Sequence, residues 1–212
     1  MPVEDGRSIV GKGYDSIAAK YLSYRASAFT HEERAFLDRV CAIIPANLDV
    51  LELGCGAGEP ITAVLAGLGR VTGIDISERQ LTLARERVPD ARFVLADMAD
   101  VEFRPSSFVA VVAFASITHV PRESHATLFQ RIASWLRPNG IFAGELGRGD
   151  NPGELASDWM GAPMYWSHFD ADHTLGLLRD AGFDIEEAGA VRGLEPDGSS
   201  SDWLGVIARR SN

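Results

Sequence analysis

The chain has 212 residues and an acidic composition, with 30 Asp and Glu against 20 Lys and Arg and a formal net charge of −10. This length suits one well-packed domain and is short for two, so a single domain over 1–212 is expected. The net charge disfavours nucleic acid as a partner, and no apolar run approaches the ~20 residues of a membrane span. Residues 1–5 lack the basic start and apolar segment of a secretory signal, which predicts a cytoplasmic protein with a small-molecule partner.

The part before the first strand is expected to be helical. Residues 10–25 carry apolar and aromatic side chains at helical spacing. A second helix is expected from His31 to about Ile44, because Thr30 and Glu33 stand at the spacing of a capping box.

A strand and a glycine-rich turn follow at 49–58. The run Val50–Leu53 is apolar with one acid, as in a buried parallel strand, and a helix is expected over Glu59–Ala66 with a proline in its first turn. Between them stand three glycines, Gly54, Gly56 and Gly58. Glycine is needed there because the chain must turn with positive φ and because a Cβ would keep a bulky ligand from the backbone.

The spacing of these glycines decides between ligands. A dinucleotide fingerprint needs a glycine where Glu59 stands, and this acid at the head of a helix would repel a pyrophosphate. A phosphate-cradling P-loop would need Lys and Ser or Thr after the glycines, and neither is present. A ligand without phosphate is favoured, and a nicotinamide-dependent dehydrogenase is the disfavoured alternative.

Two further strands each end in an acid. Arg70–Ile76 carries Asp75 roughly 20 residues past the glycines, where a carboxylate can hold a ribose diol. The run 91–96 is followed by Asp97. Between these strands Ser77 is expected to cap a helix over Glu78–Arg87.

The rest of the chain continues the alternation of strands and helices. Strands are expected at 108–115, 141–146, 184–192 and 202–210, with helices at 122–136 and 170–181. Glu145, late in its strand, would bind a cationic ligand or pair with an arginine. Residues 147–168 are rich in aromatic side chains but broken by glycine and proline, so they are expected to form an irregular segment that meets a substrate, or an aromatic satellite core that shields a sheet edge.

Four motifs occur in one order: Glu52–Gly58, Gly73–Ser77, Ala96–Met98 and Leu136–Gly140. On these motifs the chain resembles the class I S-adenosylmethionine-dependent methyltransferases, in their small-molecule branch of types 11 and 12. The resemblance implies an α/β fold, a Rossmann-like three-layer sandwich with a seven-stranded, mostly parallel sheet. Its last strand would be antiparallel and lie between the fifth and sixth. It further implies an N-terminal helical lid at about 1–30 and an aromatic-rich acceptor-site insertion at about 147–170.

The resemblance implies S-adenosyl-L-methionine as cofactor, with S-adenosyl-L-homocysteine as product. In the family pattern the glycines give the cofactor room, one acid holds the ribose, a later Asp-Met pair meets the adenine, and Tyr14 or Tyr21 of the lid touches the methionine portion. The alternative is that these tyrosines only anchor the helix on the sheet. The residues implied at the cofactor are Tyr14, Tyr21, Glu52, Gly54, Cys55, Gly56, Gly58, Asp75, Ile76, Gln80, Asp97, Met98 and Ala115.

The aromatic residues favour a planar, mostly apolar acceptor such as an indole or phenol of specialised metabolism. The expected substrate-binding residues are Tyr24, Trp159, Met164, Tyr165 and Trp166, and the candidate catalytic residues are His119, Tyr24 and His168. His119 would serve as a base or would only anchor its loop.

Several alternatives stay open. The acceptor could be an amine or a carboxylate, the protein could bind S-adenosylmethionine without catalysis, and it could be a monomer or a homodimer. No metal is expected, because Ser116–Pro121 lacks the acidic ligands of the metal-dependent catechol-type enzymes. The two cysteines, Cys41 and Cys55, form neither a disulfide framework nor a metal site.

Overall fold

A computed structural model describes residues 5–211, so the first four residues of the expected lid lie outside the described part. No helix among the described residues is long and apolar enough to cross a membrane. The helices are α1 (Gly6–Ala28), α2 (His31–Ile43), α3 (Ile61–Ala66), α4 (Glu78–Arg87), α5 (His125–Trp135) and α6 (Ala171–Asp180), with 3₁₀ turns η1 (Ile117–His119) and η2 (Arg122–Ser124). The strands are β1 (Asp49–Leu53), β2 (Arg70–Asp75), β3 (Arg92–Leu95), β4 (Phe108–Phe114), β5 (Leu136–Leu146), β6 (Asn151–Trp159), β7 (Ala162–His168), β8 (Phe183–Leu194) and β9 (Ser200–Arg210).

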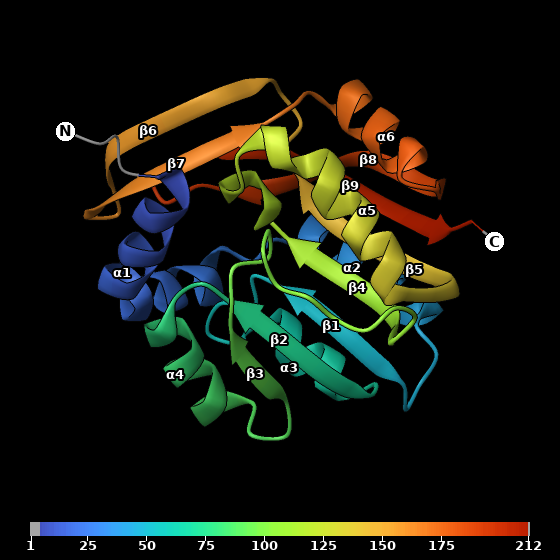
Figure 1. Cartoon of the computed structure of the whole chain (residues 1–212). Coiled ribbons are helices and arrows are strands. Elements are labelled where there is room, and N and C mark those ends of the chain that lie inside the picture. Colours follow the sequence, from blue (N-terminus) through green and yellow to red (C-terminus); the bar gives the residue numbers. More distant parts are fainter. Residues whose placement is uncertain (1–4, 212) are drawn as a thin grey trace.

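A seven-stranded sheet organises the molecule in the order β3-β2-β1-β4-β5-β9-β8. The strands from β1 to β5 pair in parallel, whereas β9 pairs antiparallel with both β5 and β8. The predicted fold is therefore confirmed, including the place of the last strand. In Figure 1 the arrowheads of β1, β2 and β4 point toward α1, so the carboxyl ends of these strands meet the N-terminal helix.

Each face of the sheet buries its own apolar cluster under helices. One cluster joins the sheet to α5 and α6 and contains the fully buried Trp135, Phe129 and Phe142. The other joins it to α2 and α3 through Phe36 and Leu65. The strand β4 is buried along its whole length, as an all-apolar run at the centre of a parallel sheet should be.

Local sequence signals set the helix starts. Oγ1 of Thr30 accepts from the backbone N–H of Glu33, and the Glu33 carboxylate accepts from Thr30 N–H in return, which completes the expected capping box of α2. Ser77 caps α4 as expected, with its Oγ accepting from Gln80 N–H. Asp15 of α1 reaches this same cap, since its carboxylate accepts from Ser77 Oγ at 2.6 Å.

Residues 147–170 are more regular than the sequence indicates. The expected irregular segment contains a separate two-stranded antiparallel sheet, β6 and β7. The strands are joined through Met160 and Gly161, both at positive φ, and register shifts next to Gly153 and before Trp159 absorb the irregular positions.

The hairpin β6–β7 lies over α1, as Figure 1 shows. Between them sits a third apolar cluster in which Val10 and Ile17 of α1 meet Ala162 and Met164 of β7. Partly buried aromatic side chains, among them Trp159 and Trp166, pack around this cluster, which fixes the hairpin to the N-terminal helix rather than shielding an edge of the main sheet.

Candidate functional site

The glycine turn after β1 leaves space on one side only. Gly54 and Gly56 have φ of +72° and +54°. A Cβ on Gly54 would lie 2.4 Å from Cβ of Ser116, whereas a Cβ on Gly56 would meet only Oε1 of Gln80, at 4.0 Å. The turn is thus tight against the loop after β4 and open toward α4.

Gly58 and Cys55, both expected at the cofactor, do not line the cavity in front of the turn. A Cβ on Gly58 would press on Val88 at 3.1 Å and on Ala84, so this glycine lets α4 pack closely. Cys55 is buried, and desolvation raises the pKa of its thiol well above the usual value, which keeps the thiol protonated. Both residues support the turn from behind.

Asp75 is buried at the end of β2, where backbone donors hold its carboxylate. Oδ2 accepts from Gly56 N–H at 2.8 Å and Oδ1 from Ser77 N–H at 2.9 Å. Burial raises the pKa of this carboxyl to about 6, against these hydrogen bonds, so it is mostly ionised at neutral pH. Each oxygen keeps a lone pair for a hydroxyl donor, as a ribose diol requires.

Two more buried polar side chains flank the turn. The Gln80 amide is 1% exposed and makes no hydrogen bond among the described residues. It lines the same cavity as Gly56, so its donor and acceptor are available to a ligand. Glu52 accepts from Thr62 Oγ1 at 2.6 Å, and desolvation raises its pKa to about 8.

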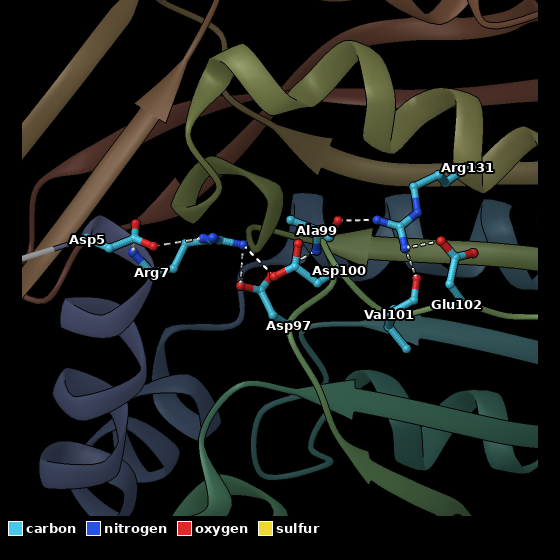
Figure 2. Close-up of polar contacts among 8 residues, drawn as sticks. All are labelled: Asp5, Arg7, Asp97, Ala99, Asp100, Val101, Glu102 and Arg131. Carbon is cyan, nitrogen blue, oxygen red and sulfur yellow. Dashed lines mark hydrogen bonds and ion pairs between the residues drawn. The ribbon is translucent and has the colours of Figure 1, made fainter.

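The loop after β3 is held from the N-terminal helix. Figure 2 shows Arg7 of α1 reaching between the carboxylates of Asp97 and Asp100, to which its Nη1 donates at 3.1 and 2.8 Å. The other oxygen of Asp97 accepts from Ala99 N–H. Arg7 thereby ties the start of α1 to the residues expected at the adenine.

The same loop is held from the opposite side by α5. In Figure 2 the guanidinium of Arg131 donates to the carbonyls of Ala99 and Val101 and, at 2.8 Å, to the carboxylate of Glu102. The loop carrying Asp97 is therefore held between α1 and α5.

These elements enclose a first cavity, here the glycine-loop cavity. Most of the expected cofactor residues line it: Tyr14, Tyr21, Gly54, Gly56, Asp75, Ile76, Gln80, Asp97, Met98 and Ala115. Glu52 and Cys55 line a smaller hollow behind the turn instead. The ionised carboxylate of Asp75 fits the ribose of S-adenosylmethionine. The unpaired amide of Gln80 and the open turn at Gly56 fit a part of this cofactor that lies against the backbone.

A second cavity of about 400 Å³, here the hairpin cavity, lies under β6 and β7. It has the size of a small-molecule site. It shares four residues with the glycine-loop cavity, namely Tyr14, Tyr21, Ala115 and His119. These four residues, here the shared wall, therefore border both cavities.

His119 is 9% exposed and has both ring nitrogens engaged. Nδ1 lies 2.7 Å from the carbonyl oxygen of Tyr165, and Nε2 lies 2.9 Å from the hydroxyl of Tyr14. Desolvation lowers the pKa of His119 to about 4, so the ring is neutral at pH 7. The histidine joins η1, the hairpin and α1.

The other expected catalytic residues are further from the shared wall. Tyr24 lines the hairpin cavity, but its hydroxyl donates to the carbonyl of Leu194. His168 also lines this cavity, with Nδ1 2.8 Å from the carbonyl oxygen of Gly149. Neither lines the glycine-loop cavity, whose lining among the described residues includes His119 alone of the three.

The expected aromatic acceptor residues divide into two groups. Trp159 and Trp166 line the hairpin cavity, and their rings meet edge to face at 5.6 Å. Met164 is fully buried against α1, so its placement at the acceptor is wrong. The Tyr165 ring packs over Gly6 and Gly153, and only its backbone carbonyl reaches His119, because alternate residues of a strand face opposite sides.

Three charged residues were missed or misplaced. Arg7 and Arg25 line the cavities, and Arg25 forms a buried ion pair with Glu33 at 3.1 Å. Both stand in the segment expected as a lid, but nothing in helical spacing marks a cavity-facing arginine. Glu145, expected to bind a cationic ligand or pair with an arginine, is fully buried, and its carboxyl oxygens have no hydrogen-bond partner in the described part of the chain.

Comparison with known proteins finds a family match over part of the chain. Residues 50–140, from β1 to the start of β5, match a family described as a methyltransferase domain. This segment of the chain is similar to methyltransferase domains, in agreement with the motifs of the sequence and with the seven-stranded sheet. The predicted resemblance is therefore borne out over residues 50–140.

Two curated relatives of the chain come from bacteria. The 27-O-demethylrifamycin SV methyltransferase of Amycolatopsis mediterranei is 31% identical over 155 residues, 63% of this chain and 56% of that protein. A trans-aconitate 2-methyltransferase of Enterobacter sp. is 39% identical over 98 residues, 45% of this chain and 37% of that protein. The chain thus spans about half or less of the length of these relatives.

Solved structures agree on the fold. The 1,6-didemethyltoxoflavin-N1-methyltransferase of Burkholderia thailandensis, solved with its substrate and S-adenosylhomocysteine, superposes with a TM-score of 0.74 at 20% identity. The match covers all of this chain and 93% of that one. Among residues 5–211 no group of three His, Cys, Asp or Glu side chains could hold a metal ion.

Proposed function

We propose that the protein transfers the methyl group of S-adenosylmethionine to a small molecule bound in the hairpin cavity. The observation that carries this proposal is the shared wall of Tyr14, Tyr21, Ala115 and His119. The cofactor lies in the glycine-loop cavity with its ribose on Asp75 and its adenine near Asp97 and Met98. Its methyl group then faces the hairpin cavity across this wall.

The reaction is an in-line displacement at the methyl carbon of a sulfonium. Since the leaving thioether is neutral, most of the work is to hold the acceptor about 3 Å from that carbon in line with the C–S bond. A base is needed only where the acceptor must lose a proton. The two cavities do the positioning, and the neutral ring of His119 is available to receive a proton.

The acceptor we favour is a planar aromatic compound such as an indole or phenol. The rings of Trp159, Trp166 and Tyr21 line the hairpin cavity and offer flat apolar surface. Tyr24 and His168 also line it and would orient polar groups of the acceptor.

A carboxylate acceptor is the second candidate. Part of the chain resembles trans-aconitate 2-methyltransferases, and Arg25, whose guanidinium pairs with Glu33, is a cation in the lining of the hairpin cavity. A carboxylate is already ionised at neutral pH, so its methylation requires no base. Dependence of turnover on His119 therefore separates the two candidates.

The remaining expectations belong to the same proposal. One domain carries the activity, with residues up to about 30 as the lid and 147–170 as the acceptor-site insertion. The protein acts in the cytoplasm, as a monomer or homodimer, on a metabolite of specialised metabolism and without nucleic acid.

Mass spectrometry of labelled products tests this proposal. The protein is incubated with methyl-labelled S-adenosylmethionine and a panel of indoles, phenols, amines and carboxylic acids, beside an Asp75→Ala control. A labelled product that depends on Asp75 supports methyl transfer, and its structure names the acceptor class. Cofactor binding without any labelled product would favour a non-catalytic S-adenosylmethionine-binding protein.

A further inference from the structure

We propose that the Tyr14 hydroxyl takes the proton of the acceptor and passes its own proton to Nε2 of His119 as the methyl group moves. Tyr14 is then the catalytic residue, and His119 is the proton acceptor behind it. This inference rests on the proposed function, because it requires an acceptor that carries a proton on the methylated atom.

The hydrogen bonds of His119 fix where its hydrogen lies. A backbone carbonyl can only accept, so the contact of 2.7 Å to the Tyr165 carbonyl places the ring hydrogen on Nδ1. Nε2 of the neutral ring then carries a lone pair, and the Tyr14 hydroxyl at 2.9 Å must donate to it. The pair is therefore already oriented for transfer from tyrosine to histidine.

Tyr14 is better placed than His119 to touch the acceptor. Both nitrogens of His119 are engaged. The Tyr14 oxygen, with its hydrogen pointing at the histidine and one lone pair turned to the Tyr21 hydroxyl, keeps a second lone pair. The Tyr14 ring lies edge to face with Tyr21 at 4.9 Å and with Trp159 at 6.0 Å, which holds the hydroxyl at the wall between the cavities. Burial also raises the pKa of Tyr14 well above its usual value, so the phenol keeps its hydrogen until the reaction.

The step balances without any further reactant. The lone pair of the acceptor oxygen or nitrogen forms a bond to the methyl carbon, and the C–S bond breaks with its electron pair left on sulfur. The acceptor proton moves to the Tyr14 oxygen, and the Tyr14 proton moves to Nε2 of His119. One positive charge is lost at the sulfonium and one appears on the imidazolium, so the buried site keeps its net charge. The imidazolium proton returns to water after product release.

The test compares Tyr14→Phe, His119→Ala and the double variant with the wild type on a phenol or indole that the wild type methylates. Phe keeps the ring contacts, and S-adenosylhomocysteine affinity measured by calorimetry reports whether the cavity is intact. We expect kcat to fall at least about 100-fold in each single variant, far more than the S-adenosylhomocysteine affinity, although both residues line the cofactor cavity. The kcat of the double variant should be no lower than that of the less active single variant, because each substitution breaks the same relay.

Imidazole gives a second readout that a structural role would not change. Added imidazole should restore part of the turnover of His119→Ala but none in the double variant, because it needs the Tyr14 hydroxyl as its donor. Full kcat in Tyr14→Phe, or a loss that matches a loss of S-adenosylhomocysteine affinity, would overturn the relay and leave the proposed function standing. If the wild type methylates no acceptor, both the proposed function and the relay are wrong. If it methylates only carboxylates, the relay is wrong and the proposed function stands.

Discussion

At the scale of single residues, Asp75 should control cofactor binding through its charge. The ribose needs the carboxylate as acceptor, and the pKa of this buried group is raised to about 6. Since the group is protonated below that value, S-adenosylhomocysteine affinity should fall as the pH drops from 7 to 5. The Asp75→Asn variant should bind S-adenosylhomocysteine about 10- to 100-fold more weakly at pH 7. Its affinity should no longer fall between pH 7 and 5, because Asn does not titrate. Calorimetry across the pH range measures both, with the melting temperature as a control for folding.

Residue identities could be predicted where a motif marks them. Gly54, Gly56 and Asp75 line the glycine-loop cavity because strand, turn and acid follow one another along the chain. The Tyr14–His119 contact joins residues 105 positions apart, so only the folded chain brings them together.

At the scale of elements, the Arg7 bridge should hold α1 closed over the cofactor. Its guanidinium bonds Asp97 and Asp100, but these groups are partly exposed, so the bridge contributes little energy. Arg7→Ala should weaken cofactor binding by about 2- to 5-fold and remove part of its salt dependence. Arg39→Ala is a matched control, because Arg39 pairs with Glu187 at 2.8 Å between α2 and β8. Equal effects in the two variants would contradict a role for Arg7 in closing the lid.

The bounds of helices and strands could be predicted where capping residues and the apolar pattern of the sequence agree. The bounds of α4 match the prediction, since Ser77 starts the helix and the sequence after Arg87 ends it. The hairpin β6–β7 was not predicted, because Pro152, Gly153 and Pro163 hide its alternation. Its strands form by pairing with each other and packing on α1, and neither contact is local.

At the scale of the whole molecule, buried acids should set the pH dependence of stability. Desolvation raises the pKa of both Glu52 and Glu145 to about 8, whereas an unfolded chain loses these protons near pH 4.5. The folded state therefore binds more protons between these values, so the free energy of unfolding should fall as the pH rises from 5 to 8.

Glu145→Gln should remove part of this loss. The variant keeps the shape of the side chain but cannot ionise, so its stability should fall between pH 5 and 8 by about 1–3 kcal/mol less than that of the wild type. Urea unfolding at the two pH values measures the difference. An unchanged pH dependence would mean that Glu145 ionises freely in the folded protein.

Cofactor and acceptor are expected to meet at the wall formed by Tyr14, Tyr21, Ala115 and His119. A crystal structure of the protein with S-adenosylhomocysteine tests this most directly. We expect the ribose hydroxyls on Asp75 and the sulfur beside Ala115, facing the hairpin cavity. A sulfur that faces away from the hairpin cavity, or a ribose bound elsewhere than Asp75, would contradict the account.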